Sequence, residues 1–300
     1  MGLVGRFLTR GHPENQYISL VKRVLRRGET RFGRNGQTKA VFGASMRFPL
    51  SDDVLPLLTT KAVSWRICLK ELLWFMGGHT DNSMLQVQGV RIWDGNASRA
   101  FLDGRGLARN RTGDLGPIYG HQWRHFNAPY VSASHDYGDE GVDQLGGIAS
   151  ALCDPERRRS RRLVMSAWNP CQLDEMALPP CHVLAQFSVD EGGGLSCALY
   201  QRSGDVGLGV PFNIASYSML THILAHHSGL KAREFIHFIG DAHIYDEHRG
   251  GLAKQVGRVP RPFPRIRVGR RHAEIGDYSL ADVRVSGYRP HPKIPMPMAA

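Results

Sequence analysis

Cys181 is the residue of this sequence best suited to do chemistry. It stands in the run Leu178-Pro179-Pro180-Cys181-His182, where the prolines fix φ and remove backbone donors, so the thiol is held on a rigid approach. A cysteine attacks only as its thiolate, and a nearby arginine or histidine lowers the thiol pKa. Most lone cysteines are buried and structural. The run alone therefore leaves a nucleophile and a structural thiol both open.

Three polar residues that follow Cys181 favour the nucleophile. Arg202 and Asp205 lie in the run Gln201-Arg202-Ser203-Gly204-Asp205, and Asn213 ends Pro211-Phe212-Asn213. A carboxamide offers a donor and an acceptor, which matches the imide edge of a pyrimidine. Asn is also a favoured helix N-cap, and Asn213 immediately precedes a predicted apolar helix over residues 214–227. Base recognition and helix capping remain alternatives for this residue.

Other elements must position these groups. Apolar spacing predicts helices over residues 16–27 and 64–76, and Glu71 lies inside the second, where an unpaired carboxylate is costly. Strands are predicted over residues 163–168, 183–189 and 195–200, which places Cys181 at the start of a strand.

His243 and Tyr245 are two residues apart, so in an extended stretch they face the same way and could bind one sugar hydroxyl. A buried tyrosine and a satisfied histidine are the ordinary alternative.

Composition sets the outer limits. The chain has 300 residues, 42% of them apolar, and a formal charge of +11. No apolar stretch reaches the about 18 residues of a membrane span, and no secretory signal is evident. The five cysteines include no Cys-x-x-Cys pair, so no disulfide framework or zinc site is indicated. The cytosol or the nucleus is the expected compartment.

Arginines account for the positive charge. One cluster covers residues 157–162 and a second run covers residues 258–271. Such a surface attracts nucleic acid or small phosphorylated substrates, although a solvated charged face is the ordinary interpretation, above all for the second run. Aromatic residues are not interleaved as in a platform for single strands. A small multiply charged substrate therefore competes well with RNA.

The motifs together resemble the thymidylate synthase family, closest in pattern to the forms of animals and of their large DNA viruses. The resemblance covers roughly residues 16–300 and rests on long runs in a fixed order, which include Pro56-Leu57-Leu58-Thr59-Thr60-Lys61, Glu71-Leu72-Leu73-Trp74-Phe75, Ile92-Trp93-Asp94, Gly113-Asp114-Leu115-Gly116-Pro117-Ile118-Tyr119-Gly120, the Cys181 run, Tyr200-Gln201-Arg202-Ser203-Gly204-Asp205, Leu208-Gly209-Val210-Pro211-Phe212-Asn213 and Gly240-Asp241-Ala242-His243-Ile244-Tyr245.

The resemblance implies an α/β fold, a large mixed β-sheet flanked by helices, in a homodimer joined sheet to sheet. It implies one domain over residues 1–300, with residues 1–15 as a poorly ordered N-terminal extension. The implied reaction is the reductive methylation of dUMP to dTMP with 5,10-methylenetetrahydrofolate, which becomes dihydrofolate. The reaction proceeds through a covalent bond between Cys181 and C6, and no metal is required.

The resemblance also implies a role for each matching residue. Catalysis falls to Cys181, Glu71, Tyr119, His182, Arg202 and Asp205. The dUMP site comprises Arg34, Arg161, Arg162, Arg202, Ser203, Asp205, Asn213, His243 and Tyr245, with Arg161 and Arg162 acting on the partner subunit's site. The folate site comprises Ile92, Trp93, Asp205, Leu208, Gly209, Phe212 and the terminal Ala300.

Three departures from the family pattern concern the phosphate loop and the tail. Arg34 is kept, but the loop around it is altered over residues 33–39. Ala62 follows Thr59-Thr60-Lys61 where the family has an arginine. Two prolines stiffen the C-terminal segment over residues 293–300.

Two other functions stay open. A pyrimidine hydroxymethylase on the same scaffold would capture the intermediate with water, but Asn213 disfavours cytosine and Trp93 would shield the intermediate. A non-catalytic binding protein, for example of RNA, would use the net charge, but it would not need the complete catalytic set.

Overall fold

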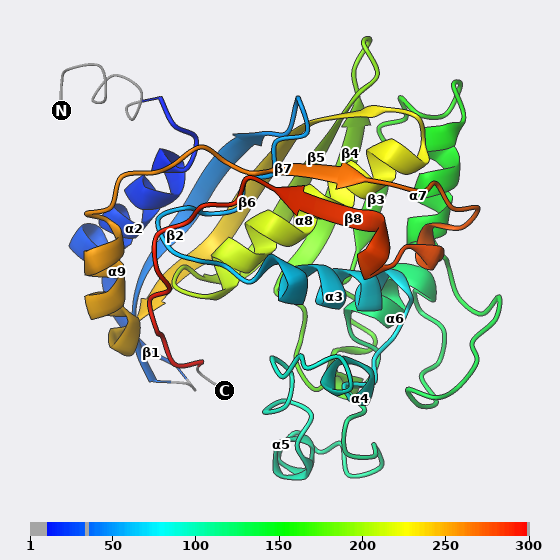
Figure 1. Cartoon of the computed structure of the whole chain (residues 1–300). Coiled ribbons are helices and arrows are strands. Elements are labelled where there is room, and N and C mark those ends of the chain that lie inside the picture. Colours follow the sequence, from blue (N-terminus) through cyan, green and yellow to red (C-terminus); the bar gives the residue numbers. More distant parts are fainter. Residues whose placement is uncertain (1–10, 34–35, 299–300) are drawn as a thin grey trace.

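A six-stranded mixed sheet forms the frame of the molecule (Figure 1). The computed structural model describes residues 11–33 and 36–298. The strand order is β1-β2-β6-β5-β4-β3, and only the β5–β6 pair is parallel. This confirms the expected α/β fold with a large mixed sheet. The strands are β1 (Glu29–Gly33), β2 (Gly36–Pro49), β3 (Val164–Ser166), β4 (His182–Val189), β5 (Gly194–Asp205) and β6 (Lys231–Tyr245).

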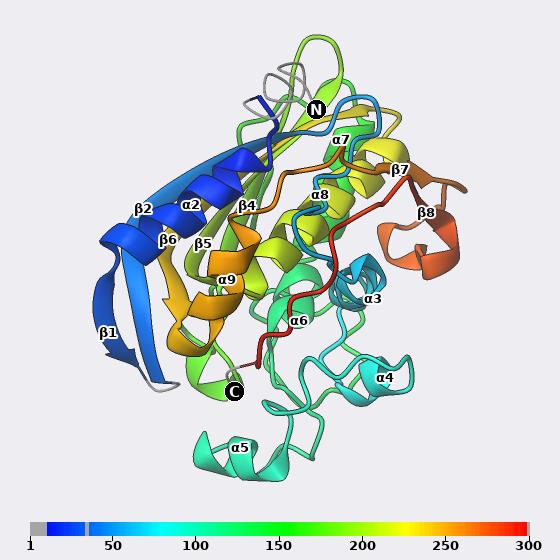
Figure 2. The ribbon, with the colours of Figure 1, turned by 60° about the vertical axis from the view of Figure 1, so that its left-hand side comes forward.

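Helices cover one face of this sheet (Figures 1 and 2). The long helix α8 (Gly209–His227) packs on β5 and β6, and α3 (Trp65–Met76) packs on α8. Nearly every residue of α8 is buried, as a helix that is apolar all round requires. The other helices are α2 (Asn15–Arg27), α4 (Ser83–Gln86), α5 (Arg99–Gly104), α6 (Tyr119–Arg124), α7 (Gln144–Cys153) and α9 (Arg249–Gln255), and a small second sheet pairs β7 (Arg265–Val268) with β8 (Val283–Ser286).

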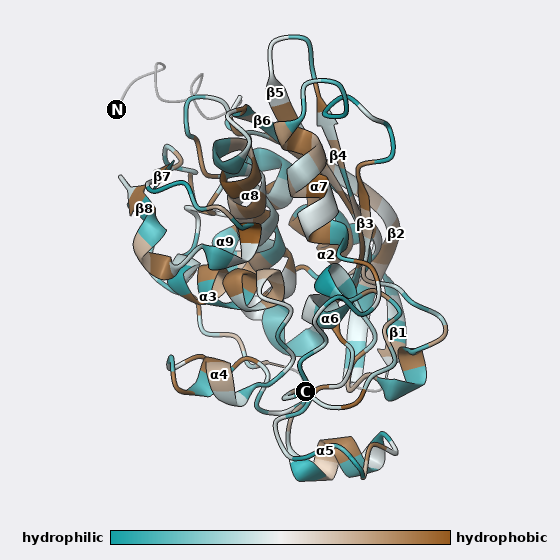
Figure 3. Ribbon diagram, turned by 90° about the vertical axis from the view of Figure 1, so that its right-hand side faces the viewer, coloured by the Kyte–Doolittle hydropathy of each residue, from teal (hydrophilic) through white to brown (hydrophobic). Residues whose placement is uncertain are grey.

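The opposite face of the sheet carries exposed apolar side chains. Tyr200 pairs with Phe238 across β5 and β6, so both point to the same side. They are 40% and 44% exposed, and Val164 on the edge strand β3 is 41% exposed. In Figure 3 the helices that pack on the sheet lie on its other side. In the described part of the chain, this face therefore has an apolar surface without a layer over it.

The predicted elements agree with the structure except at one helix start. The helices expected over residues 16–27 and 64–76 are α2 and α3, and the three predicted strands are confirmed as β3, β4 and β5. The helix expected over residues 214–227 begins earlier, at Gly209. Pro211 lies in its first turn, where the missing N–H has no partner within the helix. Asn213 is thus inside α8, and the N-cap alternative is wrong.

Glu14 ties the start of the chain to the loop before α3. Its side chain is buried and accepts hydrogen bonds from the backbone N–H and hydroxyl groups of Thr59 and Thr60 at 2.6–2.9 Å. The N-terminal extension expected over residues 1–15 therefore ends earlier, because residues 11–14 form a turn that packs against the body of the fold. Residues 1–10 lie outside the described range.

Part of the second arginine run fastens the C-terminal segment. Arg258 donates to the carbonyls of Thr60 at 2.8 Å and Pro292 at 2.7 Å, and Arg261 donates to those of Arg289 and Pro290 at 3.2 Å. These two arginines hold chain segments together, so the expectation of a solvated charged face fails for them. Over residues 11–33 and 36–298, no helix is long and apolar enough to cross a membrane.

Candidate active site

The Cys181 loop is fixed by backbone contacts to two other elements. The Cys181 N–H donates to the Tyr119 hydroxyl at 2.7 Å, and the Cys181 carbonyl accepts from the Arg202 N–H at 2.9 Å. Tyr119 begins α6 and Arg202 lies in β5. The thiol therefore stands where the start of β4, the end of β5 and α6 meet, as its position before a strand predicted.

Arg202 supports this loop through its side chain. Its guanidinium donates to the carbonyls of Pro180 and Pro179, both at 2.8 Å, and lies 5.4 Å from the centre of the Trp168 ring. Burial raises the pKa of the Cys181 thiol, and Arg202 only partly opposes this rise. The sequence led us to expect a lowered thiol pKa, but in the free chain desolvation of the thiolate is the larger effect.

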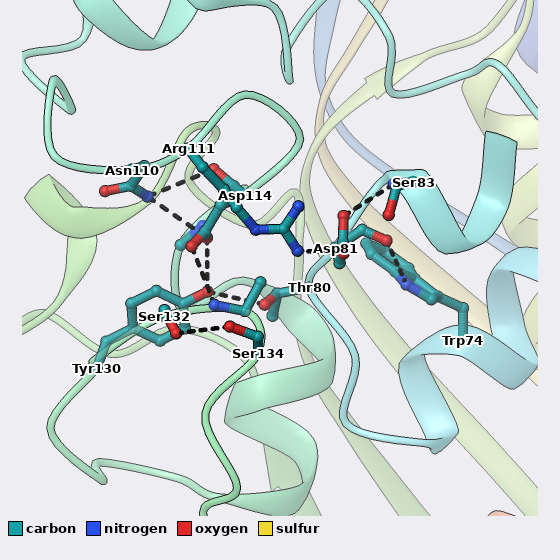
Figure 4. Close-up of polar contacts among 12 residues, drawn as sticks. Trp74, Thr80, Asp81, Ser83, Asn110, Arg111, Asp114, Tyr130, Ser132 and Ser134 are labelled. Carbon is teal, nitrogen blue, oxygen red and sulfur yellow. Dashed lines mark hydrogen bonds and ion pairs between the residues drawn. The ribbon is translucent and has the colours of Figure 1, made fainter.

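A polar network around Asp114 lies in the loop that precedes Tyr119 and α6, and Figure 4 shows this network. The Asp114 carboxylate accepts from the Tyr130 hydroxyl at 2.6 Å and from the N–H groups of Gly116 and Ala133, both at 2.9 Å. These bonds fix the turn that leads into α6. Burial also raises the pKa of Tyr119, so its hydroxyl stays neutral beside the cysteine loop.

Glu71 faces the same cleft from α3. Its carboxylate accepts from the Trp93 indole N–H at 2.8 Å. Burial raises the pKa of Glu71 to about 7, although the Trp93 bond opposes the rise. A carboxyl group with a pKa near neutrality can give and take protons at working pH. The Glu71 side chain is turned inward, and its catalytic role stays a prediction.

His182 and Asn213 lie behind the cysteine loop. Both are buried, and the His182 ring lies between those of Tyr119 and Tyr217, tilted to the first at 5.0 Å and edge-on to the second at 5.3 Å. Burial lowers the pKa of His182 to about 4, opposed by Asn213. The Asn213 side chain interacts with His182, but within residues 11–33 and 36–298 its amide oxygen has no hydrogen bond of good geometry. A buried acceptor with so weak a contact can accept a hydrogen bond from a ligand.

His243 and Tyr245 end β6 and face the same side, as their spacing predicted. Their rings meet edge to face at 5.3 Å. The His243 Nδ1 lies 3.0 Å from Asp241, whose carboxylate accepts from Arg31 at 2.6 Å. Strand register sets Ser203 beside Asp241 and Asp205 beside His243. Arg31 and Asp241 were not among the sequence predictions, because their partnership depends on the pairing of β1, β2 and β6.

Asp205 ends β5 beside an apolar wall. Its carboxylate accepts from the Gly207 N–H at 2.7 Å. Of the wall residues predicted from sequence, Trp93 is buried, while Ile92 and Phe212 are partly buried and pack against the core. Leu208 and Gly209 form the start of α8 at an intermediate exposure. One carboxylate above apolar side chains suits a flat heterocycle with one polar edge.

Comparison with known proteins identifies the family. The thymidylate synthase family model matches residues 15–300. The chain is 53% identical over 290 residues to the thymidylate synthase of equine herpesvirus 2, covering 96% of this chain and 99% of that protein. It is 50% identical to the human enzyme, covering 96% and 91%, and 49% identical to that of Saccharomyces cerevisiae, covering 95% and 97%.

The chain belongs to the thymidylate synthase family. The reaction of this family is the methylation of dUMP to dTMP with 5,10-methylenetetrahydrofolate as co-substrate. In the described ranges, 11–33 and 36–298, no group of three or more His, Cys, Asp or Glu side chains is arranged to hold a metal ion.

Of the residues predicted for the thymidylate synthase site, two stand apart from the Cys181 cluster in this one chain and two lie outside the described residues. Arg161 and Arg162 are exposed just before β3, and among the described residues neither guanidinium has a hydrogen bond or ion pair. Arg34 and Ala300 lie outside the described residues.

Sequence reasoning also missed polar neighbours of the thymidylate synthase site. His237 contacts Gln201 at 2.7 Å, Lys61 donates to the Gly207 carbonyl, and His248 lies 3.4 Å from Asp205. The alternation of strand β6 could have indicated that His237 points inward, but no local pattern indicates the other two contacts.

Proposed function

We propose that the cleft around Cys181 carries out the reductive methylation of dUMP to dTMP, with Cys181 as the nucleophile. The observation that supports this most is the buried amide of Asn213 beside His182, whose oxygen has no hydrogen bond of good geometry within residues 11–33 and 36–298. The imide N–H of a uracil would give this oxygen a well-placed donor, and the Asn213 amide N–H would meet a uracil carbonyl. Cytosine has no proton at that ring nitrogen, so the same geometry disfavours it.

The nucleophilic step uses the thiolate of Cys181. Its sulfur adds to C6 of the pyrimidine, the C5–C6 double bond opens, and C5 gains the electron pair. The Arg202 guanidinium, which contacts the cysteine loop, binds the phosphate dianion of the nucleotide. After C5 bonds to the folate methylene, the C5 proton leaves and the bond from that methylene to the folate nitrogen breaks. Hydride from tetrahydrofolate then reduces the exocyclic methylene to methyl as the C6–sulfur bond breaks, which returns the thiolate and leaves dihydrofolate.

Glu71, Tyr119 and His182 organise water and proton transfer. Glu71 has a pKa of about 7, so it exchanges protons readily near neutral pH. Tyr119 holds the backbone of the nucleophile at 2.7 Å and orders the groups around C5. His182 stays neutral because burial lowers its pKa to about 4, and it therefore acts as a hydrogen-bonding group.

The nucleotide is held at its two polar ends. His243 and Tyr245 take the 3′-hydroxyl, since both rings face the cleft from the end of β6. Arg202, Ser203 and Arg34 take the phosphate, where guanidinium groups give strong bidentate contacts.

The folate fits the wall formed by Ile92, Trp93, Leu208, Gly209 and Phe212, with Asp205 on the polar edge of the pterin; the predicted contribution of Ala300 lies outside the described residues. When bound, it supplies the one-carbon unit and the hydride.

The phosphate site also requires a second subunit. The open sheet face with Val164, Tyr200 and Phe238 suits a sheet-to-sheet homodimer, because exposed apolar patches of this kind mark interfaces. Arg161 and Arg162 stand just before Val164, and Arg202 follows Tyr200 by two residues on the same side of β5. A two-fold axis through this face gives each site the partner's arginines. We place the whole chain in one domain, and the enzyme in the cytosol or the nucleus.

Product analysis tests this function. Purified protein with dUMP and 5,10-methylenetetrahydrofolate should yield dTMP and dihydrofolate in equal amounts. Formation of 5-hydroxymethyl-dUMP would indicate the hydroxymethylase instead, and no turnover would contradict both. A matched control is Cys171→Ser, because Cys171 is exposed and lies outside the cleft cluster. This variant should keep its activity.

A further inference from the structure

His248 is a buried histidine that the proposed reaction does not use. It ends the short 3-10 turn after β6 (Asp246–His248), and its side chain is 1% exposed. Its Nε2 lies 2.7 Å from the Pro297 carbonyl oxygen, and its Nδ1 lies 3.4 Å from Asp205 Oδ1. One imidazole therefore stands between the carboxylate of the folate site and the C-terminal segment.

Both neighbours of the ring can only accept hydrogen bonds. A carbonyl oxygen requires a proton on Nε2, and an ionised carboxylate favours a proton on Nδ1. A neutral ring protonated on Nε2 would point the lone pair of Nδ1 at an oxygen of the Asp205 carboxylate, which is repulsive. The imidazolium turns this 3.4 Å approach into an attractive ion contact, although within the described residues Nδ1 makes no hydrogen bond of good geometry.

The surroundings of the ring agree with a charged form. Burial lowers the pKa of His248, but the Asp205 carboxylate and the Pro297 carbonyl outweigh burial, so the net pKa is raised. Lys61 is the cation that opposes the charge, and the Tyr245 ring lies edge-on at 5.6 Å. Gly207 leaves the room that the ring needs, because a Cβ there would lie 2.6 Å from Nδ1.

We propose that His248 is a positioning residue that couples the folate site to the C-terminal segment, bridging Asp205 and the Pro297 carbonyl as an imidazolium. The inference rests on the proposed function, since it assigns Asp205 to the pterin. Charged His248 orients Asp205 and holds residues 294–298 against the folate wall. Neutral His248 releases that segment.

The rest of the tail depends on this contact. Pro292 is fastened by Arg258. Beyond it, in the part of the tail that the structure describes, the polar contacts are those of His248 with Pro297 and of Lys61 with the Met296 sulfur at 4.0 Å. Ile294 and Met296 pack closely on Gly251 of α9. Figure 2 shows the C-terminal segment running beside α9.

The pH dependence follows from the sign of the shift. A histidine whose pKa is raised by folding contributes its contact fully below the ordinary value of about 6.5 and loses it as pH rises through the folded value. Protection of the tail should therefore be greatest near pH 6 and fall at alkaline pH. The KM for 5,10-methylenetetrahydrofolate should rise over the same range, while the KM for dUMP should stay nearly constant.

The test compares His248→Gln with wild type. Glutamine can still donate to the Pro297 carbonyl but carries no charge, so the variant should lose the pH dependence of two quantities. The first is the rate of hydrogen exchange at the Met296 and Met298 amides, corrected for intrinsic rates. The second is the KM for folate. In the variant this KM should be several-fold higher than in wild type, with a smaller change in kcat. The matched control is His222→Gln. His222 is also buried and contacts a carbonyl, that of Val54 at 2.9 Å, but it lies outside the cleft, so its variant should behave as wild type.

Two outcomes would overturn the coupling. One is that, in wild type, neither the hydrogen exchange of the tail amides nor the KM for folate varies with pH. The other is that the His248→Gln variant shows the same pH dependence of both quantities as wild type. If that variant does not fold, Asp205→Asn with dUMP bound serves instead. Loss of the carboxylate should move the release of the tail to lower pH. Failure of the proposed function is separate, because it would appear as absent dTMP formation in wild type.

Discussion

The two ends of the dUMP cleft are built in opposite ways. At the base end, Glu71, Tyr119, His182 and Asn213 are enclosed, and Glu71 and Tyr119 each have a hydrogen bond within the same chain. At the phosphate end, Arg161 and Arg162 are exposed, and among the described residues neither guanidinium has a hydrogen bond or ion pair. Burial shifts the pKa values of Glu71, Tyr119 and His182 at the base end.

This difference has a physical reason. Proton transfer requires a group whose pKa lies near neutrality, and burial in low dielectric gives Glu71 such a pKa, about 7. A phosphate dianion requires permanent positive charge, and several guanidinium groups buried together without an anion would be very costly. One chain can therefore complete the base end alone, but it leaves the phosphate end to be completed by binding and assembly.

The largest effect should come from the nucleophile at the base end. Cys181→Ser should lower kcat by on the order of 10⁴-fold or more, because a hydroxyl is far less ionised than a thiol at neutral pH. The thermal midpoint and the Kd for dUMP should stay close to wild type, since the loop is held by backbone groups. Turnover of the variant near the wild-type rate would remove Cys181 from the mechanism.

The phosphate end predicts complementation between subunits. Cys181→Ser and Arg161→Ala/Arg162→Glu proteins should each be inactive. After they are refolded together, about half of the dimers are hybrids with one whole site of two, so roughly a quarter of wild-type activity should return. If verified hybrid dimers show no recovery of activity, Arg161 and Arg162 act on the site of their own subunit. As a control, Arg157→Ala should be active alone, because Arg157 pairs with Asp154 and Ser150 of its own chain.

A reverse mixture sharpens the same test. A protein that carries all three substitutions should inactivate wild-type subunits by forming hybrid dimers when the two are refolded at equal amounts. If the arginines act across the interface, a hybrid dimer has no whole site, and the activity is about a quarter of that of the same amount of wild-type protein. If they act within one subunit, about half remains.

Substitution of Asn213 at the base end should change the preference of the enzyme between dUMP and dCMP. Asn213→Asp offers a protonatable carboxyl in place of the amide, so the preference should move from dUMP towards dCMP. We expect the ratio of the two kcat/KM values to change by about 10- to 100-fold, corresponding to about 1.4–3 kcal/mol for one altered hydrogen-bond pair. An unchanged ratio would mean that Asn213 does not meet the base. Its position inside α8 already removes the capping role that would otherwise explain its retention.

The contrast between the two ends also shows what the sequence could predict. Local patterns predicted α2 and α3 because apolar spacing is a property of neighbouring residues. The start of α8 was missed because Gly209 and Pro211 break helices in most positions, whereas a first turn tolerates them. The contact between His248 and Asp205 could not be predicted, since it depends on how the end of β6 packs against the end of β5. The roles of Arg258 and Arg261 in fastening the tail were hidden for the same reason.

The smallest effect should be a change in the pH profile through Trp93. Its indole N–H donates to Glu71 at 2.8 Å and lowers the carboxyl pKa against the effect of burial. Trp93→Phe keeps an aromatic wall but removes the donor, so the pKa of Glu71 should rise further above about 7. One hydrogen bond of about 1 kcal/mol would move the bend of the kcat/KM profile upward by about 0.7 pH unit.

The bend must first be assigned to Glu71 by its loss in Glu71→Gln. Trp74→Phe is the matched control, because the Trp74 indole donates to the Asp81 carbonyl at 3.1 Å and not to Glu71, so its profile should keep the wild-type position. A bend that moves equally in both tryptophan variants would reflect general loosening of the base end. A bend that stays fixed in Trp93→Phe would mean that burial alone sets the proton affinity of Glu71, and the base end would then need no hydrogen-bonded partner to work near neutral pH.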